Sequence, residues 1–193
     1  MIVGITGSIA CGKSIVLNYL KLKGYKVLSL DDICHDLLEE DDINEEVKKA
    51  LGIECFGKAS RKQIGDQVFS DDNKLKILND ILHPLAIKKM ELEIKIARAV
   101  RGHLFIEVPL LYEKKMNRYF DTVWFIYADL ETQIKRLISR NNMTREEALN
   151  RINKQIGVDE KMQMAILYGD YVIDNSGDLV YTYNRIDSFL QEM

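Results

Sequence analysis

Residues 7–14 of the chain read Gly7-Ser8-Ile9-Ala10-Cys11-Gly12-Lys13-Ser14 and fit the pattern G-x-x-x-x-G-K-[ST]. The apolar run 2–5 precedes this stretch and predicts a buried strand, while residues 15–20 follow it with the spacing of a helix. In such a strand–loop–helix context the glycines let successive N–H groups point into one concavity, and the start of the helix adds positive potential. We therefore expect residues 7–14, together with Ile15, to bind the phosphates of a nucleoside triphosphate.

Two side chains of this phosphate loop carry specific expectations. Lys13 is placed to contact the β- and γ-phosphates, and the Ser14 hydroxyl is placed to ligate Mg²⁺. A glycine-rich turn without a ligand is the alternative, but the preceding strand together with Gly-Lys-Ser disfavours it. Mg²⁺ is the only cofactor that the sequence predicts.

Composition limits the class of protein. The 193 residues are 47% hydrophobic and 30% charged, with a net charge of −3, as in a globular protein of one well-cored domain with insertions or of a core plus small appendages. No apolar run approaches the ~20 residues that span a bilayer, and we expect no signal peptide and no membrane partner. The balance of 27 basic and 30 acidic residues argues against a nucleic-acid partner. Three cysteines without metal-like spacing favour a cytoplasmic location.

The order of predicted elements indicates an α/β fold. Apolar runs predict further strands at residues 26–30, 103–108, 122–127 and 171–174, and a C-terminal helix that carries Leu179 to Leu190. Between them, residues 33–100 have helical spacing, far more than one crossover needs. Ser60 and Gln63 predict a capping box, Ser70 begins a predicted turn, and Pro84 is predicted to open a helix with His83 extended before it.

A polar helical hairpin follows the fourth predicted strand. Asp129 is expected to cap a helix on which Arg136 and Arg140 share one face, and residues 144–147 predict a second capping box. An exposed helical pair with solvated or paired arginines is one interpretation. Beside a phosphate loop, however, planar guanidinium groups suit a lid that closes over phosphates.

Carboxylates at the ends of predicted strands are candidate catalytic groups. Asp31 and Asp32 follow the second strand, and Glu107 lies near the end of the third, so all three fall on the edge that carries the phosphate loop. We expect Asp32 to cap the next helix and Asp31 to accept a proton from an attacking hydroxyl. For Glu107, assistance to a magnesium-bound water and a purely structural role both stay open.

The chain also resembles the dephospho-CoA kinase family nearly end to end. The matching positions are residues 7–14, 27–31, Ile33, His35, Arg61, 68–70, 82–85, 108–113, 132–137, Arg140, 144–146, Gln155, 160–161 and 172–177. The phosphate loop is common to many families, but His-Pro-Leu, Pro-Leu-Leu and Ile-Asp-Asn-Ser-Gly in this order are specific. Ser29 stands where the family usually has the first aspartate of Asp-x-Asp, and Ile15 replaces a usual threonine.

The resemblance implies a P-loop NTPase fold: a three-layer α/β/α core with a five-stranded parallel sheet, an inserted helical substrate domain and a helical lid. The long helical stretch and the arginine-bearing hairpin predict the same division, with the core at residues 1–31, 101–138 and 163–193, the substrate domain at 32–100, and the lid at 139–162. The resemblance implies that the substrates are ATP and dephospho-CoA, and that the ribose 3′-hydroxyl is phosphorylated to give CoA and ADP. We expect a monomer or a small homo-oligomer.

By position in the family, Asp31, Lys13 and Arg140 would be catalytic, and Asp31 would also contact the acceptor. His83 and Arg136 would bind substrate, and the loop at Asn175 would approach the adenine of ATP. A kinase of another small acceptor, such as a nucleoside monophosphate or shikimate, and an ATP-binding module without turnover are the alternatives.

Overall fold

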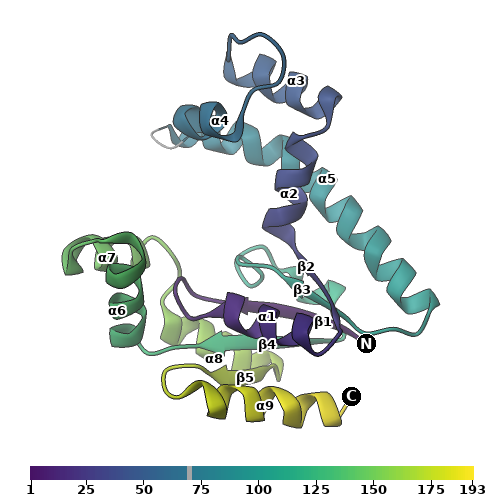
Figure 1. The fold of residues 1–193 in the computed structure, drawn as a ribbon, viewed down its shortest axis with the longest axis vertical. Coiled ribbons are helices and arrows are strands. Elements are labelled where there is room, and N and C mark those ends of the chain that lie inside the picture. Colours follow the sequence, from purple (N-terminus) through teal and green to yellow (C-terminus); the bar gives the residue numbers. More distant parts are fainter. Residues whose placement is uncertain (69–70) are drawn as a thin grey trace. The chain divides into compact units, whose positions relative to one another are not determined.

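The computed structural model describes residues 1–68 and 71–193, which fold into two compact units. The first unit comprises Met1–Leu28 and Ala97–Met193, and the second comprises Ser29–Ile96. Figure 1 shows the first unit as a sheet covered by helices and the second as helices alone. No helix in the described ranges has both the length and the apolar character needed to cross a membrane.

A five-stranded sheet forms the centre of the first unit. Its strands are β1 (Ile2–Gly7), β2 (Lys26–Ser29), β3 (Leu104–Glu107), β4 (Thr122–Tyr127) and β5 (Tyr171–Asp174), in the order β2-β3-β1-β4-β5. β1 pairs in parallel with β3 on one side and with β4 on the other, and β4 pairs in parallel with β5. The five predicted strands are therefore confirmed, with β2 and β3 shorter at their ends than predicted.

Alternate residues of the central strands face two different layers. On one face Val3, Ile5 and Trp124 belong to one buried cluster with residues of α1 (Lys13–Leu22) and α9 (Leu179–Gln191). On the other face Gly4 lies so close to Phe120 and Leu111 that a Cβ added to it would come within 2.9 Å and 3.0 Å of them. The helix α8 (Val158–Tyr168), which contacts β4 and β5, continues that second cover. Two such covers make the sheet the middle of three layers.

The hairpin after β4 consists of α6 (Leu130–Asn141) and α7 (Arg145–Ile152). The Asp129 carboxylate accepts from the Thr132 N–H at 2.7 Å and caps α6 as predicted. The predicted capping box between Thr144 and Glu147 is also present at the start of α7. Arg145 pairs with Glu131 of α6 rather than with its own neighbours, with Nη1 2.9 Å from the carboxylate, and this bond holds the pKa of Glu131 below its usual range.

The second unit is helical, with α2 (Leu30–Leu38), α3 (Asp41–Leu51), α4 (Arg61–Val68) and most of α5 (Asp72–Ala99). Asn44 is buried and holds the loop before α4, because its side chain donates to the carbonyls of Leu38 and Ala59 and accepts from the Ala59 N–H. The reciprocal bonds between Ser60 and Gln63 confirm the predicted capping box. The predicted turn at Ser70 and the family match at residues 69–70 lie outside the described residues.

The prediction that Asp32 caps a helix is wrong. The N-cap of α2 is Ser29, whose hydroxyl accepts from the Asp32 N–H at 3.4 Å. The helix therefore begins at Leu30, three residues earlier than expected, and Asp31 and Asp32 lie in its first turn. Carboxylates are also favourable there, because they face the positive end of the helix.

The prediction that Pro84 opens a helix is also wrong, since Pro84 lies inside the continuous helix α5 and His83 is helical. Proline removes one intrahelical hydrogen bond and crowds the preceding turn. Against that cost, α5 buries a row of residues four apart: Leu78, Leu82, Ala86 and Met90. Burial of this row on both sides of Pro84 keeps the helix continuous.

Candidate active site

The phosphate loop connects the last residue of β1, Gly7, to the first residue of α1, Lys13. Gly12 is the N-cap of α1 and has a φ of 91°, a left-handed conformation that favours glycine. A Cβ on Gly12 would lie 2.1 Å from Nδ2 of Asn175, and one on Gly7 would lie 2.4 Å from the Ile126 carbonyl oxygen. Both glycines of the motif are therefore required by close approach of the backbone to its neighbours.

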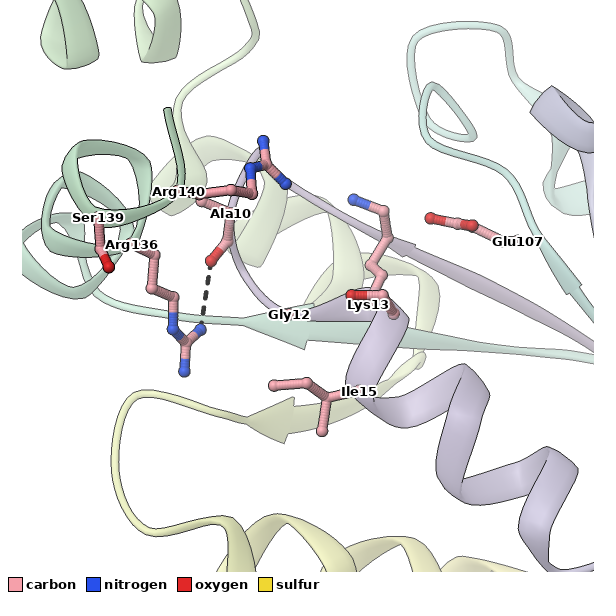
Figure 2. Close-up of a pocket in the computed structure, with 9 residues that line it drawn as sticks. Ala10, Gly12, Lys13, Ile15, Glu107, Arg136, Ser139 and Arg140 are labelled. Carbon is pink, nitrogen blue, oxygen red and sulfur yellow. Dashed lines mark hydrogen bonds between the residues drawn. The ribbon is translucent and has the colours of Figure 1, made fainter. Parts of the chain in front are cut away.

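A cavity of about 470 Å³ opens beside this loop. It is lined by Lys13 and Ser14 of the loop, Glu107 at the end of β3, and Arg136 and Arg140 of α6. Figure 2 shows Lys13, Arg140 and Glu107 extending into this region from three different elements. Three cationic side chains at the start of a helix form a site suited to a polyphosphate.

Lys13 lies over its own loop. Its ammonium group donates to the carbonyls of Gly7 at 3.0 Å and Ser8 at 3.3 Å. This position keeps the charge at the mouth of the loop, next to the N–H groups that begin α1. The contacts of Lys13 with phosphate and of Ser14 with Mg²⁺ stay predictions.

Side chains from distant segments hold the loop from outside. Arg136 donates from Nη1 to the Ala10 carbonyl at 3.2 Å and from Nη2 to the Asn175 carbonyl at 2.7 Å. Asn175 is fully buried and donates from Nδ2 to the Cys11 carbonyl at 2.8 Å. The Asn175 side chain thus braces the phosphate loop, and the approach of its loop to adenine stays a prediction.

Cys11 is a packing residue of the loop. Its side chain is fully buried in the core cluster beneath α1, and burial raises the pKa of its thiol. A buried thiol with a raised pKa is a poor nucleophile. The geometry therefore favours a packing role for Cys11 over a redox role.

A second cavity, of about 290 Å³, lies in the helical unit. Its lining includes Asp31 and His83, which the family resemblance connects with the acceptor, and also His35 of α2 and Arg61 at the start of α4. The half-buried Cys34 lies among them, and its pKa is raised to about 11, first by burial and then by the Asp31 carboxylate. The unit thus brings two of the predicted acceptor residues, Asp31 and His83, to one cavity.

Two residues with clear structural positions carried no predicted role. Gln155 accepts from the Ile9 N–H of the phosphate loop at 3.0 Å, and Arg61 lines the cavity of the helical unit. Gln155 is one polar residue within the predicted lid, so only its match to the family could have singled it out. Arg61 lies within the predicted capping box, which explained its position as the start of a helix, so the local pattern did not point to a cavity.

The residues around the phosphate loop fit a magnesium ion. Mg²⁺ prefers hard oxygen ligands and is usually held by one or two protein groups together with substrate phosphates and waters. The Ser14 hydroxyl and the Glu107 carboxylate both line the cavity. Within residues 1–68 and 71–193 no group of three or more His, Cys, Asp or Glu side chains is arranged to hold a metal.

Comparison with known proteins assigns the chain to a family. The sequence profile of the family described as dephospho-CoA kinase matches residues 1–180. The chain belongs to the dephospho-CoA kinase family. A dephospho-CoA kinase of Carboxydothermus hydrogenoformans is 36% identical over 196 residues, which cover 99% of this chain and 93% of the relative.

Solved structures agree with membership of the dephospho-CoA kinase family. The structure of dephospho-CoA kinase from Campylobacter jejuni matches with a TM-score of 0.75 at 28% identity and covers 99% of this chain and 96% of that one. A protein of Thermus thermophilus matches with a TM-score of 0.80 at 31% identity, over 100% of this chain and 97% of that one. The sheet with its covering helices is therefore the fold of this kinase family.

Proposed function

We propose that the chain transfers the γ-phosphoryl group of ATP to the ribose 3′-hydroxyl of dephospho-CoA, giving CoA and ADP, in the last step of CoA biosynthesis. Membership of the family supports the reaction. The observation that carries the proposal is the cavity beside the phosphate loop, whose lining includes three cationic residues, Lys13, Arg136 and Arg140. Such a lining would suit a triphosphate, and Ser14 and Glu107 on the same lining would supply oxygen ligands for a metal ion.

On the nucleotide side, Lys13 and the loop N–H groups would stabilise the charge that builds up on the γ-phosphoryl oxygens during transfer. Arg140 would neutralise charge from α6, and Arg136 would do so while it holds the Ala10 carbonyl. Ser14 and Glu107 would hold Mg²⁺. The ion, when bound, supplies further neutralisation of the β- and γ-oxygens.

On the acceptor side, we assign the cavity of the helical unit to dephospho-CoA. Arg61 and His83 line it and offer nitrogen donors to an anionic acceptor. Asp31 lies on the same lining, two residues after the end of β2. Its carboxylate would take the proton of the 3′-hydroxyl as that oxygen forms a bond to the γ-phosphorus and the bond from phosphorus to the ADP oxygen breaks.

Acceptor choice is the direct test of the proposed function. ADP release is measured with dephospho-CoA, a nucleoside monophosphate and shikimate as acceptors, and the product is located by mass spectrometry and phosphorus NMR. We expect release to depend on dephospho-CoA and the phosphate to appear on the ribose 3′-oxygen. Release with another acceptor would identify a different small-molecule kinase, and tight ATP binding without release would identify a binding module.

Substitution of Asp31 tests the assignment of the base. Asp31→Asn keeps the size of the side chain and removes its ability to accept a proton. We expect ATP affinity to stay within about twofold and kcat to fall by about 10²–10⁴-fold, the range for loss of a general base. Asp32→Asn, at the neighbouring exposed position, is the control and should keep kcat. Unchanged kcat in Asp31→Asn would remove Asp31 from the mechanism.

A further inference from the structure

Three consecutive residues of the phosphate loop are each held by a side chain from another part of the first unit. The Ile9 N–H donates to Oε1 of Gln155, the Ala10 carbonyl accepts from Arg136, and the Cys11 carbonyl accepts from Asn175. Only the first of these contacts takes an N–H group of the loop, and N–H groups are what such a loop uses to bind phosphate. The Gln155 contact therefore acts directly on the phosphate-binding backbone.

The residue next to this contact has an unfavourable backbone conformation. Ala10 has a φ of 58°, in the left-handed region that residues with a Cβ seldom occupy. Such a conformation persists where surrounding contacts hold it. At Ala10 these contacts lie on both sides: Gln155 holds the preceding N–H, and Arg136 holds the Ala10 carbonyl itself.

The residues that hold Ala10 come from the predicted lid and its base. Gln155 lies in the turn between α7 and α8, and Arg136 lies in α6. Ile9 and Ala10 also pack against the buried cluster between α6 and α7, which consists of Ile134, Leu137, Ala148 and Ile152. The α6–α7 hairpin is therefore attached to the phosphate loop by apolar packing and by two hydrogen bonds.

We infer that Gln155 is a positioning residue, which holds the phosphate loop in its nucleotide-binding conformation by fixing the Ile9 N–H and, through it, the left-handed Ala10. This inference rests on the proposed nucleotide site, and it gives the base of the predicted lid a part in ATP binding. It requires no contact between Gln155 and ATP.

Two variants separate the bond from the bulk of the side chain. Gln155→Ala removes the acceptor, whereas Gln155→Glu keeps an oxygen at the same reach. We expect the Ile9 amide of the ATP-free protein to exchange with deuterium at least about tenfold faster in Gln155→Ala and at a near-native rate in Gln155→Glu. Asn153→Ala removes a carboxamide from the same turn and should leave Ile9 exchange unchanged. Native exchange in Gln155→Ala would overturn the inference.

Rescue by glycine tests the connection to Ala10. Gln155→Ala should weaken ATP binding about 5- to 10-fold, as loss of one hydrogen bond predicts, with a smaller change in kcat. Ala10→Gly removes the cost of the left-handed conformation, so Ala10→Gly combined with Gln155→Ala should recover at least half of that loss on a logarithmic scale. Additive effects of the two substitutions would overturn the inference, because a merely structural Gln155 would not depend on residue 10.

The exchange and ATP-binding measurements need no acceptor. If they come out as expected while dephospho-CoA is not phosphorylated, the proposed reaction fails and the role of Gln155 stands. If dephospho-CoA is phosphorylated while Gln155→Ala keeps native exchange and ATP affinity, the proposed reaction stands and the role of Gln155 fails. The melting temperature of each variant is measured alongside, so that general unfolding is distinguished from a local change in the loop.

Discussion

Asn175 is a buried polar residue that restricts which residue can stand at the neighbouring position 12. Its Nδ2 donates to the Cys11 carbonyl, and its Oδ1 accepts from the Thr182 hydroxyl at 3.1 Å. Buried polar atoms need such partners, since an unpaired one costs about 1–3 kcal/mol. A side chain at Gly12 would collide with the same Nδ2. Glycine at position 12 and asparagine at position 175 are therefore parts of one contact, formed by residues that are far apart in the sequence.

The thiol of Cys34 reports on the Asp31 carboxylate. Burial first and the charge of Asp31 second raise the pKa of Cys34 to about 11. Replacing Asp31 by Asn removes the charge, so the pKa should fall, the thiolate fraction at pH 8 should rise, and alkylation of Cys34 by iodoacetamide should become about 2- to 10-fold faster. Peptide mass spectrometry measures the rate at each cysteine.

Asp32→Asn is the control for the alkylation experiment, because Asp32 is the next residue and does not line the cavity. It should leave the rate at Cys34 within about twofold of native. An equal acceleration by both variants would show that Cys34 responds to net charge and not to the neighbouring carboxylate of Asp31.

At the scale of single residues, the sequence predicts those roles that belong to a local pattern. The cap at Asp129 follows from its place before a helix and is confirmed, whereas the roles of Lys13 and Ser14, which the motif predicts, stay predictions. Ser29 and Asp32 are both good capping residues, and the local pattern does not decide which of the two begins the helix. Gln155 cannot be assigned this way, because its partner, the Ile9 N–H, lies 146 residues away in the sequence.

At the scale of elements, α6 matters because it presents Arg136 and Arg140, and its first turn depends on Asp129. The carboxylate accepts from the Thr132 N–H and the Thr132 hydroxyl, and these bonds hold its pKa below the usual range. Asp129→Ala removes the cap and should lower the free energy of unfolding by about 1 kcal/mol, or the melting temperature by about 2–4 °C. Thermal denaturation at pH 7 measures this.

Asp129→Asn is the matched variant, because asparagine is also a good N-cap, and it should lose less stability at pH 7. A lowered pKa in the folded state means that the carboxylate stabilises the fold above its usual pKa and that this contribution is lost as the pH falls through the lowered value. The stability difference between the native chain and Asp129→Asn should therefore shrink below about pH 4. A difference that grows with acidity would contradict the assigned bonds.

Whole elements were predictable where composition and periodicity agree. The run Thr122–Tyr127 is rich in β-branched and aromatic residues, and it forms β4 over those residues. Pro84 shows the opposite case. Its local preference is for the first turn of a helix, with an extended residue before it, whereas the buried row along α5 continues the helix through this position. Burial of that row depends on residues outside the helix, which the local sequence does not contain.

At the scale of the molecule, the sequence predicts the number of strands and the helical insertion but not the order of the strands. β1 lies between β3 and β4, so its neighbours in the sheet are more than 90 residues away in the sequence. The sequence places the inserted substrate domain at residues 32–100, and the compact helical unit spans Ser29–Ile96. The domain functions, the oligomeric state and the cytoplasmic location stay predictions.

Because the two cavities lie in different units, we predict that a substitution in one cavity changes the Kd of its own substrate and not the Kd of the other substrate. Lys13 lines the cavity of the first unit and Arg61 that of the second. Lys13→Ala should weaken ATP binding at least about tenfold and leave the Kd of dephospho-CoA within about twofold. Arg61→Ala should weaken dephospho-CoA binding about 5- to 10-fold, as loss of a charge-assisted bond predicts, and leave ATP unaffected. Calorimetric titration with each ligand alone gives both constants.

The control variant is Lys62→Ala. It removes the next cation, which does not line the cavity, and should change neither dissociation constant. Because each variant removes one positive charge, a purely electrostatic effect would weaken both anionic ligands in all three, and that result would contradict separate sites.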